Sequence, residues 1–310
     1  MQRHLGWIYF VLVALFWACS MTWLVTTKVV PVLIEGRPPV YSDVLLATHD
    51  SPVVGWTISL NDVAVGWAVG RTRRTHSGNS ILQTHSRIER LALSDILPNM
   101  GGFEESILGE GVDAKVTVDV QSEVKVDPIG RLDSFSSTIH IVEFPTRFNI
   151  RGTVIGEEMR LTITLVDANG RAGTKLGEKT VPVDPHEIIS GTLSPHAQLA
   201  RLTRNQTWTI PVYSPLSPQS PMDIMTARVT DRVPFFFDGE LLSVWLVEYH
   251  RDSGAGLGGD RHRQGAMWVR PDGLVLQQES RLLASVLHFI RMSDEEAQQL
   301  AQHVGKRGSW

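Results

Sequence analysis

Alternation of apolar and polar residues between 114 and 126 is the feature that most limits how this chain can fold. In the stretch AKVTVDVQSEVKV, valines occupy every second position except Ser122, and the positions between them are polar or charged. A period of two predicts a β-strand with one buried face, because successive side chains of a strand point to opposite sides. The tetrapeptide Asp127–Gly130 then predicts a turn, since its proline presets one φ angle and its glycine accepts a positive φ.

The same succession of strand, turn and strand recurs further along the chain. Apolar runs meet at residues 167–170, at Asp238-Gly239 and at 271–273, and Asp-Gly between apolar runs is a strong hairpin signal. No regular alternation of strands with helices is present, which argues against a doubly wound α/β fold. We therefore expect a mainly β protein, with a large curved antiparallel sheet or half-barrel and few helices.

The domain limits follow from the same pattern. We assign residues 51–292 to the antiparallel β domain. Residues 214–221 hold three prolines, so a sub-boundary near 200–221 is the alternative to one continuous sheet. Ser293 and Glu296 form a capping box that predicts a helix in the C-terminal segment 293–310, which Gly305 can end.

The strand predicted over 241–249 carries bulky apolar side chains on both faces. A strand with water on one side would not do so; a helix, a loop, the curled sheet itself or a ligand must therefore cover its second face. Phe235, Phe237 and Trp245 belong to this hairpin and are either core residues or the wall of an apolar pocket. We take these three as the candidate ligand-pocket residues.

The N-terminal segment 5–27 contains no charged residue. As a helix it would measure about 35 Å, enough to cross a bilayer core of roughly 30 Å. Trp7 and Trp23 lie near its ends, where indole rings favour the membrane interface, and Arg3 favours a cytoplasmic N-terminus. We expect an uncleaved, single-pass transmembrane signal-anchor in residues 1–28 that places the β domain outside the cytoplasmic (inner) membrane. A signal peptide cleaved near Cys19 is the alternative.

The residues after this segment, 29–50, include three prolines and show no clean period. They predict a tether between the membrane and the β domain.

Composition excludes several classes of function. The net charge of −4 provides no electrostatic footprint for nucleic acid. Cys19 is the single cysteine, so neither an internal disulfide nor a cysteine metal site can form. The run Gly254–Gly259 matches G-x-G-x-x-G, but the strand-like AMWVR rather than a helix follows it. A nucleotide loop needs that helix; we therefore expect no nucleotide and no cofactor.

Two histidines are candidates for chemistry. His186-Glu187 begins like a zinc-protease motif, but Ser190 stands where the second histidine would be. His186 and His196 could still meet as metal ligands or in a hydrolase site, although no G-x-S-x-G elbow is present. Solvent-facing loop residues are the plainer interpretation, and we assign no catalytic and no metal residue. The aspartates of the hairpins are assigned to turns for the same reason.

Two short stretches resemble a known group of exported proteins. Residues 126–132 (VDPIGRL) and 269–276 (VRPDGLVL) are similar to the strand-turn-strand element of bacterial half-barrel proteins of the Lol lipoprotein-carrier type. That resemblance implies a curved antiparallel sheet closed by helices around an apolar cavity that holds acyl chains. It implies no particular binding residue here.

These observations predict a membrane-anchored extracytoplasmic β protein of a bacterium, non-enzymatic, whose partners are the bilayer, through residues 5–27, and a lipid, a lipoprotein or another envelope protein. A structural or scaffold protein with a solid core is the first alternative. An envelope hydrolase using His186 or His196 is the second.

Overall fold

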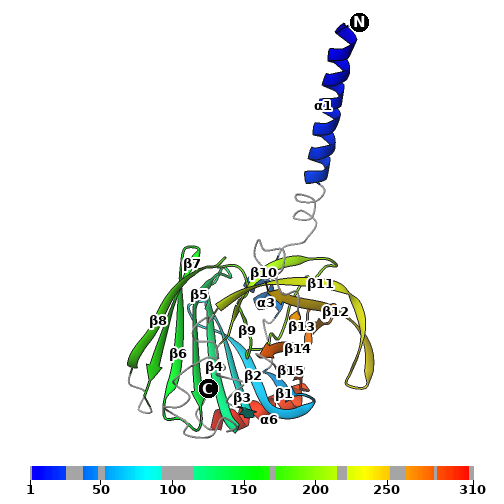
Figure 1. Ribbon diagram of the computed structural model, residues 1–310. Coiled ribbons are helices and arrows are strands. Elements are labelled where there is room, and N and C mark those ends of the chain that lie inside the picture. The colour runs from blue at the N-terminus through cyan, green and yellow to red at the C-terminus, as the bar shows by residue number, and fades with distance from the viewer. Residues whose placement is uncertain are drawn as a thin grey trace.

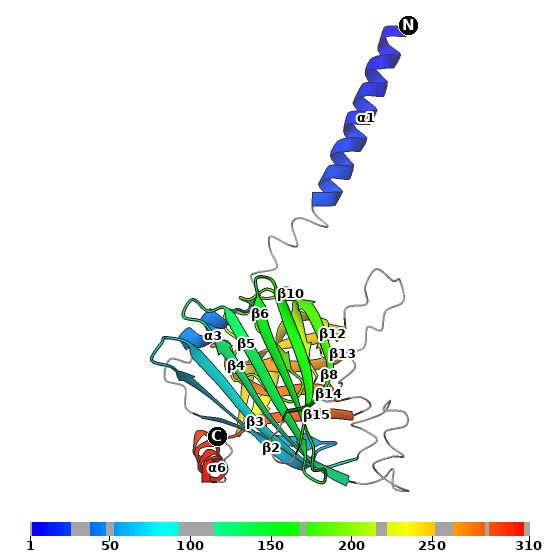
Figure 2. The same ribbon diagram turned by 90° about the vertical axis from the view of Figure 1, so that its left-hand side faces the viewer.

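The computed structural model describes residues 2–25, 38–47, 53–92, 115–167, 172–214, 222–251, 263–282 and 285–306. Within these ranges the chain forms one 15-stranded sheet, which curls so that its two halves face each other (Figures 1 and 2). The predicted large curved antiparallel sheet is thus confirmed. Its strands are, in chain order, β1 (Val54–Leu60), β2 (Val63–Arg74), β3 (Ser80–Ala92), β4 (Lys115–Val126), β5 (Leu132–Ile141), β6 (Arg147–Ile155), β7 (Glu158–Val166), β8 (Ala172–Pro182), β9 (Ser190–Gly191), β10 (Thr207–Tyr213), β11 (Met222–Phe237), β12 (Glu240–Arg251), β13 (Arg263–Val269), β14 (Val275–Leu282) and β15 (Ser285–Arg291).

Sequence neighbours pair throughout most of the sheet. The order runs from β8 back to β1, continues with β15, and then runs back to β9. All pairs are antiparallel except β9 with β10. The only non-sequential neighbours in the described sheet are therefore β1 and β15, whose pairing joins the two halves into one surface.

Local turn chemistry explains these hairpins. In the β4–β5 turn the Asp127 carboxylate accepts hydrogen bonds from the backbone N–H groups of Ile129 and Arg131. In the β11–β12 turn Asp238 and Gly239 both have positive φ, 50° and 81°, as a type I′ turn requires. The turn role predicted for these aspartates is confirmed.

The inside of the curl is filled by the chain that links its two edges. We call residues 183–206 the crossing segment, because they run from the end of β8 to the start of β10. Ser86 donates a hydrogen bond to the carbonyl of Leu193 at 2.6 Å, and the Leu199 N–H donates to the carbonyl of Gly273 at 2.8 Å. The crossing segment thus bonds to both halves of the sheet.

One hydrophobic core occupies the concave face. Large side chains from both halves are fully buried there, including Trp56, Ile139, Tyr213 and Phe289. Phe135 of β5 and Tyr213 of β10 meet edge to face with 4.6 Å between ring centroids. Strands far apart in the sheet order therefore pack against each other through the interior.

Helix α3 (Tyr41–Ala47) is a difference from the sequence prediction, which assigned residues 29–50 to a tether. Tyr41, Val44 and Leu45 of this helix are buried in the core. Their spacing of three and four residues places them on one face of a helix, and the Tyr41 hydroxyl accepts a hydrogen bond from the Ile189 N–H at 3.1 Å. This part of the segment belongs to the folded domain.

The two remaining described helices lie at the ends of the chain. The predicted C-terminal helix is confirmed as α6 (Asp294–Lys306), with the Ser293 hydroxyl and the Glu296 carboxylate forming the capping box. Helix α1 (Gln2–Leu24) stands apart from the sheet (Figure 1). In the part of the chain that the structure describes, no helix meets the length and hydropathy needed to cross a membrane.

Candidate functional site

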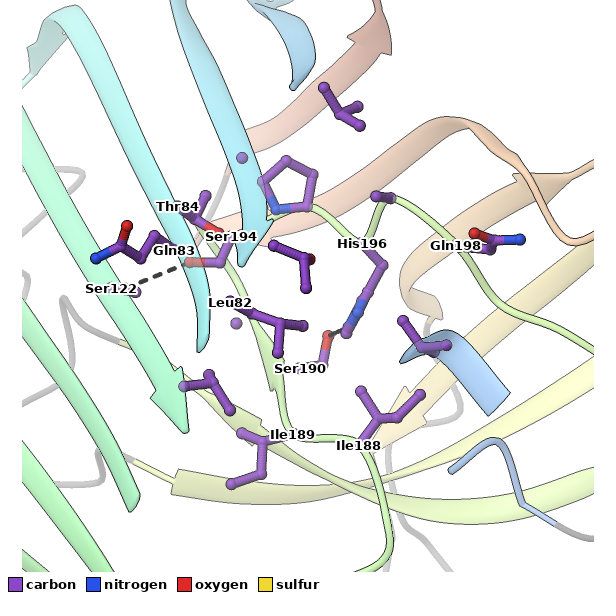
Figure 3. Close-up of a pocket in the computed structure, with 18 of the residues that line it drawn as sticks. Leu82, Gln83, Thr84, Ser122, Ile188, Ile189, Ser190, Ser194, His196 and Gln198 are labelled. Atoms are coloured by element: carbon purple, nitrogen blue, oxygen red, sulfur yellow. Dashed lines mark hydrogen bonds between the residues drawn. The ribbon is translucent and has the colours of Figure 1, made fainter. Parts of the chain in front are cut away.

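A cavity of about 110 Å³ lies between the concave face of β2–β5 and the crossing segment. Figure 3 shows its walls: strand residues on one side and residues 188–198 on the other. Its apolar lining includes Leu82, Val124, Ile188 and Ile189, and its polar lining includes Thr84, Ser122, Ser190, Ser194 and His196. We call it the inner cavity.

His196 and Ser190 form the central polar contact of the inner cavity. The imidazole Nε2 lies 2.9 Å from the Ser190 hydroxyl oxygen, and the His196 backbone N–H donates to the buried Gln278 side chain at 3.0 Å. Burial lowers the pKa of His196 to about 4, because desolvation disfavours the charged imidazolium. The ring is therefore neutral near pH 7.

Hydroxyl groups connect the crossing segment to the sheet beside this pair. The Ser194 hydroxyl donates to Ser122 at 3.4 Å (Figure 3), and Ser122 is 3.0 Å from Ser137 of the next strand. Ser122 is the residue that interrupts the valine face of β4. The sequence shows that interruption, but the contact that explains it comes from a residue 72 positions away.

The arrangement has two chemical uses. A serine and a histidine within hydrogen-bond distance can act as nucleophile and base. However, a base with a pKa near 4 removes a proton poorly at neutral pH, and no carboxylate among the described residues bonds the other ring nitrogen. The second use is to bind a small polar group, for which the cavity offers hydroxyls and an imidazole. Pockets for drug-sized ligands measure roughly 300–1,000 Å³, so this cavity holds only a smaller group.

The predicted ligand-pocket residues do not share one site. Phe235 pairs with Leu242, whereas Trp245 pairs with Arg232. A β-bulge between Val229 and Arg232 inserts one residue into β11 and so reverses which side chains of β11 face inward.

Trp245 shares its face of β12 with Val247 and packs against the core, with the Arg232 guanidinium 4.7 Å from its ring centroid. On the other face, Phe235 stacks with Phe237 and Trp268, at centroid distances of 6.4 and 5.8 Å. The prediction that both faces of β12 are covered holds for Val244 and Val247, which are fully buried.

The two candidate histidines are also apart. His186 is exposed and lies outside the inner cavity, and its backbone N–H donates to Asp184 in a local turn. Within the described ranges, no group of three histidine, cysteine or acidic side chains is arranged to hold a metal ion. The glycine run 254–259 lies outside the described residues.

The two tryptophans predicted at the membrane interface, Trp7 and Trp23, are 72% and 67% exposed on α1. Their position in a bilayer stays a prediction.

Comparisons with known proteins give a fold-level likeness only. No protein-family profile matches the chain, and no curated protein matches it. A β-barrel-like protein with a domain of unknown function, DUF1849, from Brucella abortus is 8% identical; the match covers 77% of this chain and 95% of that one, with a TM-score of 0.42. A DUF1089 family protein from Pseudomonas aeruginosa is 14% identical over 69% of this chain and 89% of that one, with a TM-score of 0.34. The resemblance to Lol-type carriers is not shown by these comparisons.

Proposed function

We propose that this chain is a non-enzymatic, membrane-tethered protein that holds a solid β domain on the extracytoplasmic side of the inner membrane for binding to an envelope partner. The observation that carries the tether is the apolar surface of α1. Leu15, Phe16 and Trp17 are 60%, 75% and 63% exposed, and residues 5–27 contain no charge. An exposed apolar surface of this kind marks an interaction site, and the uncharged segment 5–27 of the sequence is as long as a bilayer core is thick.

The filled interior favours an envelope partner over a carried lipid. Residues of the crossing segment such as Ile188, Leu193 and Leu199 occupy the concave face and are buried in the core. The inner cavity, at about 110 Å³, is smaller than pockets that enclose a drug-sized ligand. The scaffold version of the prediction therefore has more support than the carrier version.

Membrane extraction of the full chain, produced in a bacterial host, tests the tether. The double substitution Val13→Arg/Phe16→Arg places two charges near the middle of segment 5–27, where each costs about 3 kcal/mol on insertion. We expect the wild-type chain to stay in the pellet after a carbonate wash and the variant to be released. The matched control is Ile129→Arg/Ile155→Arg, which puts the same charges on exposed positions of the β domain. Retention of the α1 variant would contradict the tether.

Mass spectrometry of an organic extract tests the solid interior. The full chain and a Thr84→Phe variant, which fills the inner cavity, are purified in the same detergent. We expect the same lipids from both, since detergent-held lipid around α1 does not depend on residue 84. A stoichiometric lipid present in the wild type and lost in the variant would support a carrier instead.

A hydrolase is the second candidate, because of the 2.9 Å contact between Ser190 and His196. Ester hydrolysis with p-nitrophenyl acetate would test it. Activity that disappears in both Ser190→Ala and His196→Ala, but not in His186→Ala, would support an enzyme.

A further inference from the structure

A groove lies on the convex face of the sheet, opposite the face that carries the core. We call it the outer groove. It has a volume of about 550 Å³ and is formed by side chains of β2–β6 and the C-terminal end of α6. Its lining is mainly polar, with Trp67 and Val304 as apolar members. A volume in this range fits a small molecule.

Strand register builds the floor of this groove. Arg87 of β3 pairs with Asp119 of β4, Asp119 pairs with His140 of β5, and His140 pairs with Arg147 of β6. Side chains at paired positions share a face and lie about 5 Å apart. The four residues therefore form one continuous row of ionisable groups across four strands.

Charge is divided unevenly along this row. Arg87 lies 3.4 Å from Asp119 and 3.3 Å from Glu89, and His85 Nε2 is 3.4 Å from Asp119. Both acidic side chains of the groove are thus engaged at the Arg87 end. Among the described residues Arg147 has no ion pair. His140 is its neighbour in the row, and His303 of α6 also lines the groove.

We infer that the outer groove binds a small molecule bearing an oxyanion, either a carboxylate or a phosphate ester, at its Arg147 end. The guanidinium of arginine matches both groups through paired, charge-assisted hydrogen bonds. His140 pairs with Arg147 and adds a ring nitrogen beside it, and Trp67 of β2 gives the groove an aromatic wall at its far end. This site is separate from the membrane tether and from the inner cavity, so it goes beyond the proposed function.

Isothermal titration of the full chain in detergent tests the inference with four probes: glucuronate, glucose 6-phosphate, inorganic phosphate and neutral glucose. Binding of glucuronate or glucose 6-phosphate, with none of glucose, is the expected result. The first two probes separate a carboxylate from a phosphate ester, and inorganic phosphate shows whether the anion alone is enough. No binding of any anionic probe at millimolar concentration would overturn the inference.

Paired variants locate the site. Arg147→Gln should weaken binding at least tenfold, because it removes the charged donor. Arg228→Gln removes an exposed arginine on β11, away from the groove, and should leave the affinity unchanged. Equal losses in the two variants would show a nonspecific charge effect and overturn the site.

Asp119→Asn should change the affinity in the opposite direction. It removes the carboxylate that repels an anion and that holds Arg87, so affinity for the anionic probe should rise severalfold. A contribution of these residues to folding alone would produce no gain. Weaker binding in both Asp119→Asn and Arg147→Gln would contradict an anionic ligand.

Discussion

The inner cavity and the outer groove are built by the same strands and have opposite chemistry. On β4, Val118 and Val120 face the core and are buried, while Asp119 and Gln121, which alternate with them, line the outer groove. The inner cavity is lined by apolar side chains, hydroxyls, one neutral histidine and Arg71, which donates a hydrogen bond to Gln83. The outer groove is lined mainly by polar and ionisable side chains. A two-residue period thus places a buried, apolar face and a solvent-exposed, charged face on a single sheet.

The largest effect is expected from a charge placed on the buried face of β4. Val120→Asp buries an unpaired carboxylate in the core, and we expect a loss of at least about 4 kcal/mol in the free energy of unfolding. Gln121→Asp adds the same charge one residue later on the outer face and should change stability by less than about 1 kcal/mol. Urea denaturation followed by tryptophan fluorescence measures both. Similar losses would mean that the faces do not differ as described.

Acid should act on the inner cavity through His196. Its pKa is about 4 in the folded chain and about 6.5 in an unfolded one. The unfolded state therefore binds more protons between these values, and stability falls as the pH drops from about 6.5 to about 4. The loss attributable to this residue is at most about 3 kcal/mol.

The variant His196→Gln isolates that contribution. It keeps a polar side chain in the cavity but cannot titrate, so its urea midpoint should depend less on pH between 6.5 and 4 than that of the wild type. Measurement at four pH values across this window is sufficient. A parallel pH dependence in the two proteins would show that His196 is not the titrating group.

A smaller effect is expected where α3 meets the crossing segment. Tyr41→Phe removes the hydroxyl that accepts the Ile189 N–H and leaves that buried donor without a partner. The expected cost is about 1–3 kcal/mol in the free energy of unfolding. Urea denaturation measures it. Tyr249→Phe, whose hydroxyl donates to the Met267 sulfur at 3.4 Å rather than accepting from a buried backbone N–H, is a matched control that should cost less.

The smallest effect is expected in the outer groove. Arg87→Gln breaks ion pairs with Glu89 and Asp119 that are partly exposed, and such pairs contribute about 0–1 kcal/mol. Thermal unfolding at low salt should show a slightly lower midpoint temperature for the variant than for the wild type. At high salt, which screens the ion pairs, this difference should be smaller. A large, salt-independent loss would mean that the groove carries stability, which would weaken its assignment as a binding surface.

Much of the sheet could be predicted from local patterns. The alternation in β4, the turns at Asp127–Gly130 and Asp238-Gly239, and the Ser293–Glu296 capping box each depend on neighbours within a few residues, and each is present as expected. The candidate sites could not be predicted in this way. Ser190 and His196 are six residues apart in an irregular segment, with no periodic signal, and only the path of that segment through the curled sheet brings them into a shared cavity.

Strand register shows the same limit for a predicted site. The apolar composition of residues 235–245 is evident in the chain, but the register of the β11–β12 hairpin, which pairs Phe235 with Leu242, decides that Phe235 and Trp245 face opposite sides. The row from Arg87 to Arg147 depends in turn on the register of three strand pairs. By itself, then, the sequence determined the strands, the turns, the terminal helices and the class of fold, because backbone and side-chain preferences act over short distances. Only the tertiary structure decided which faces close into a core, where the crossing segment lies and which charges meet, because these depend on contacts between residues far apart in the chain.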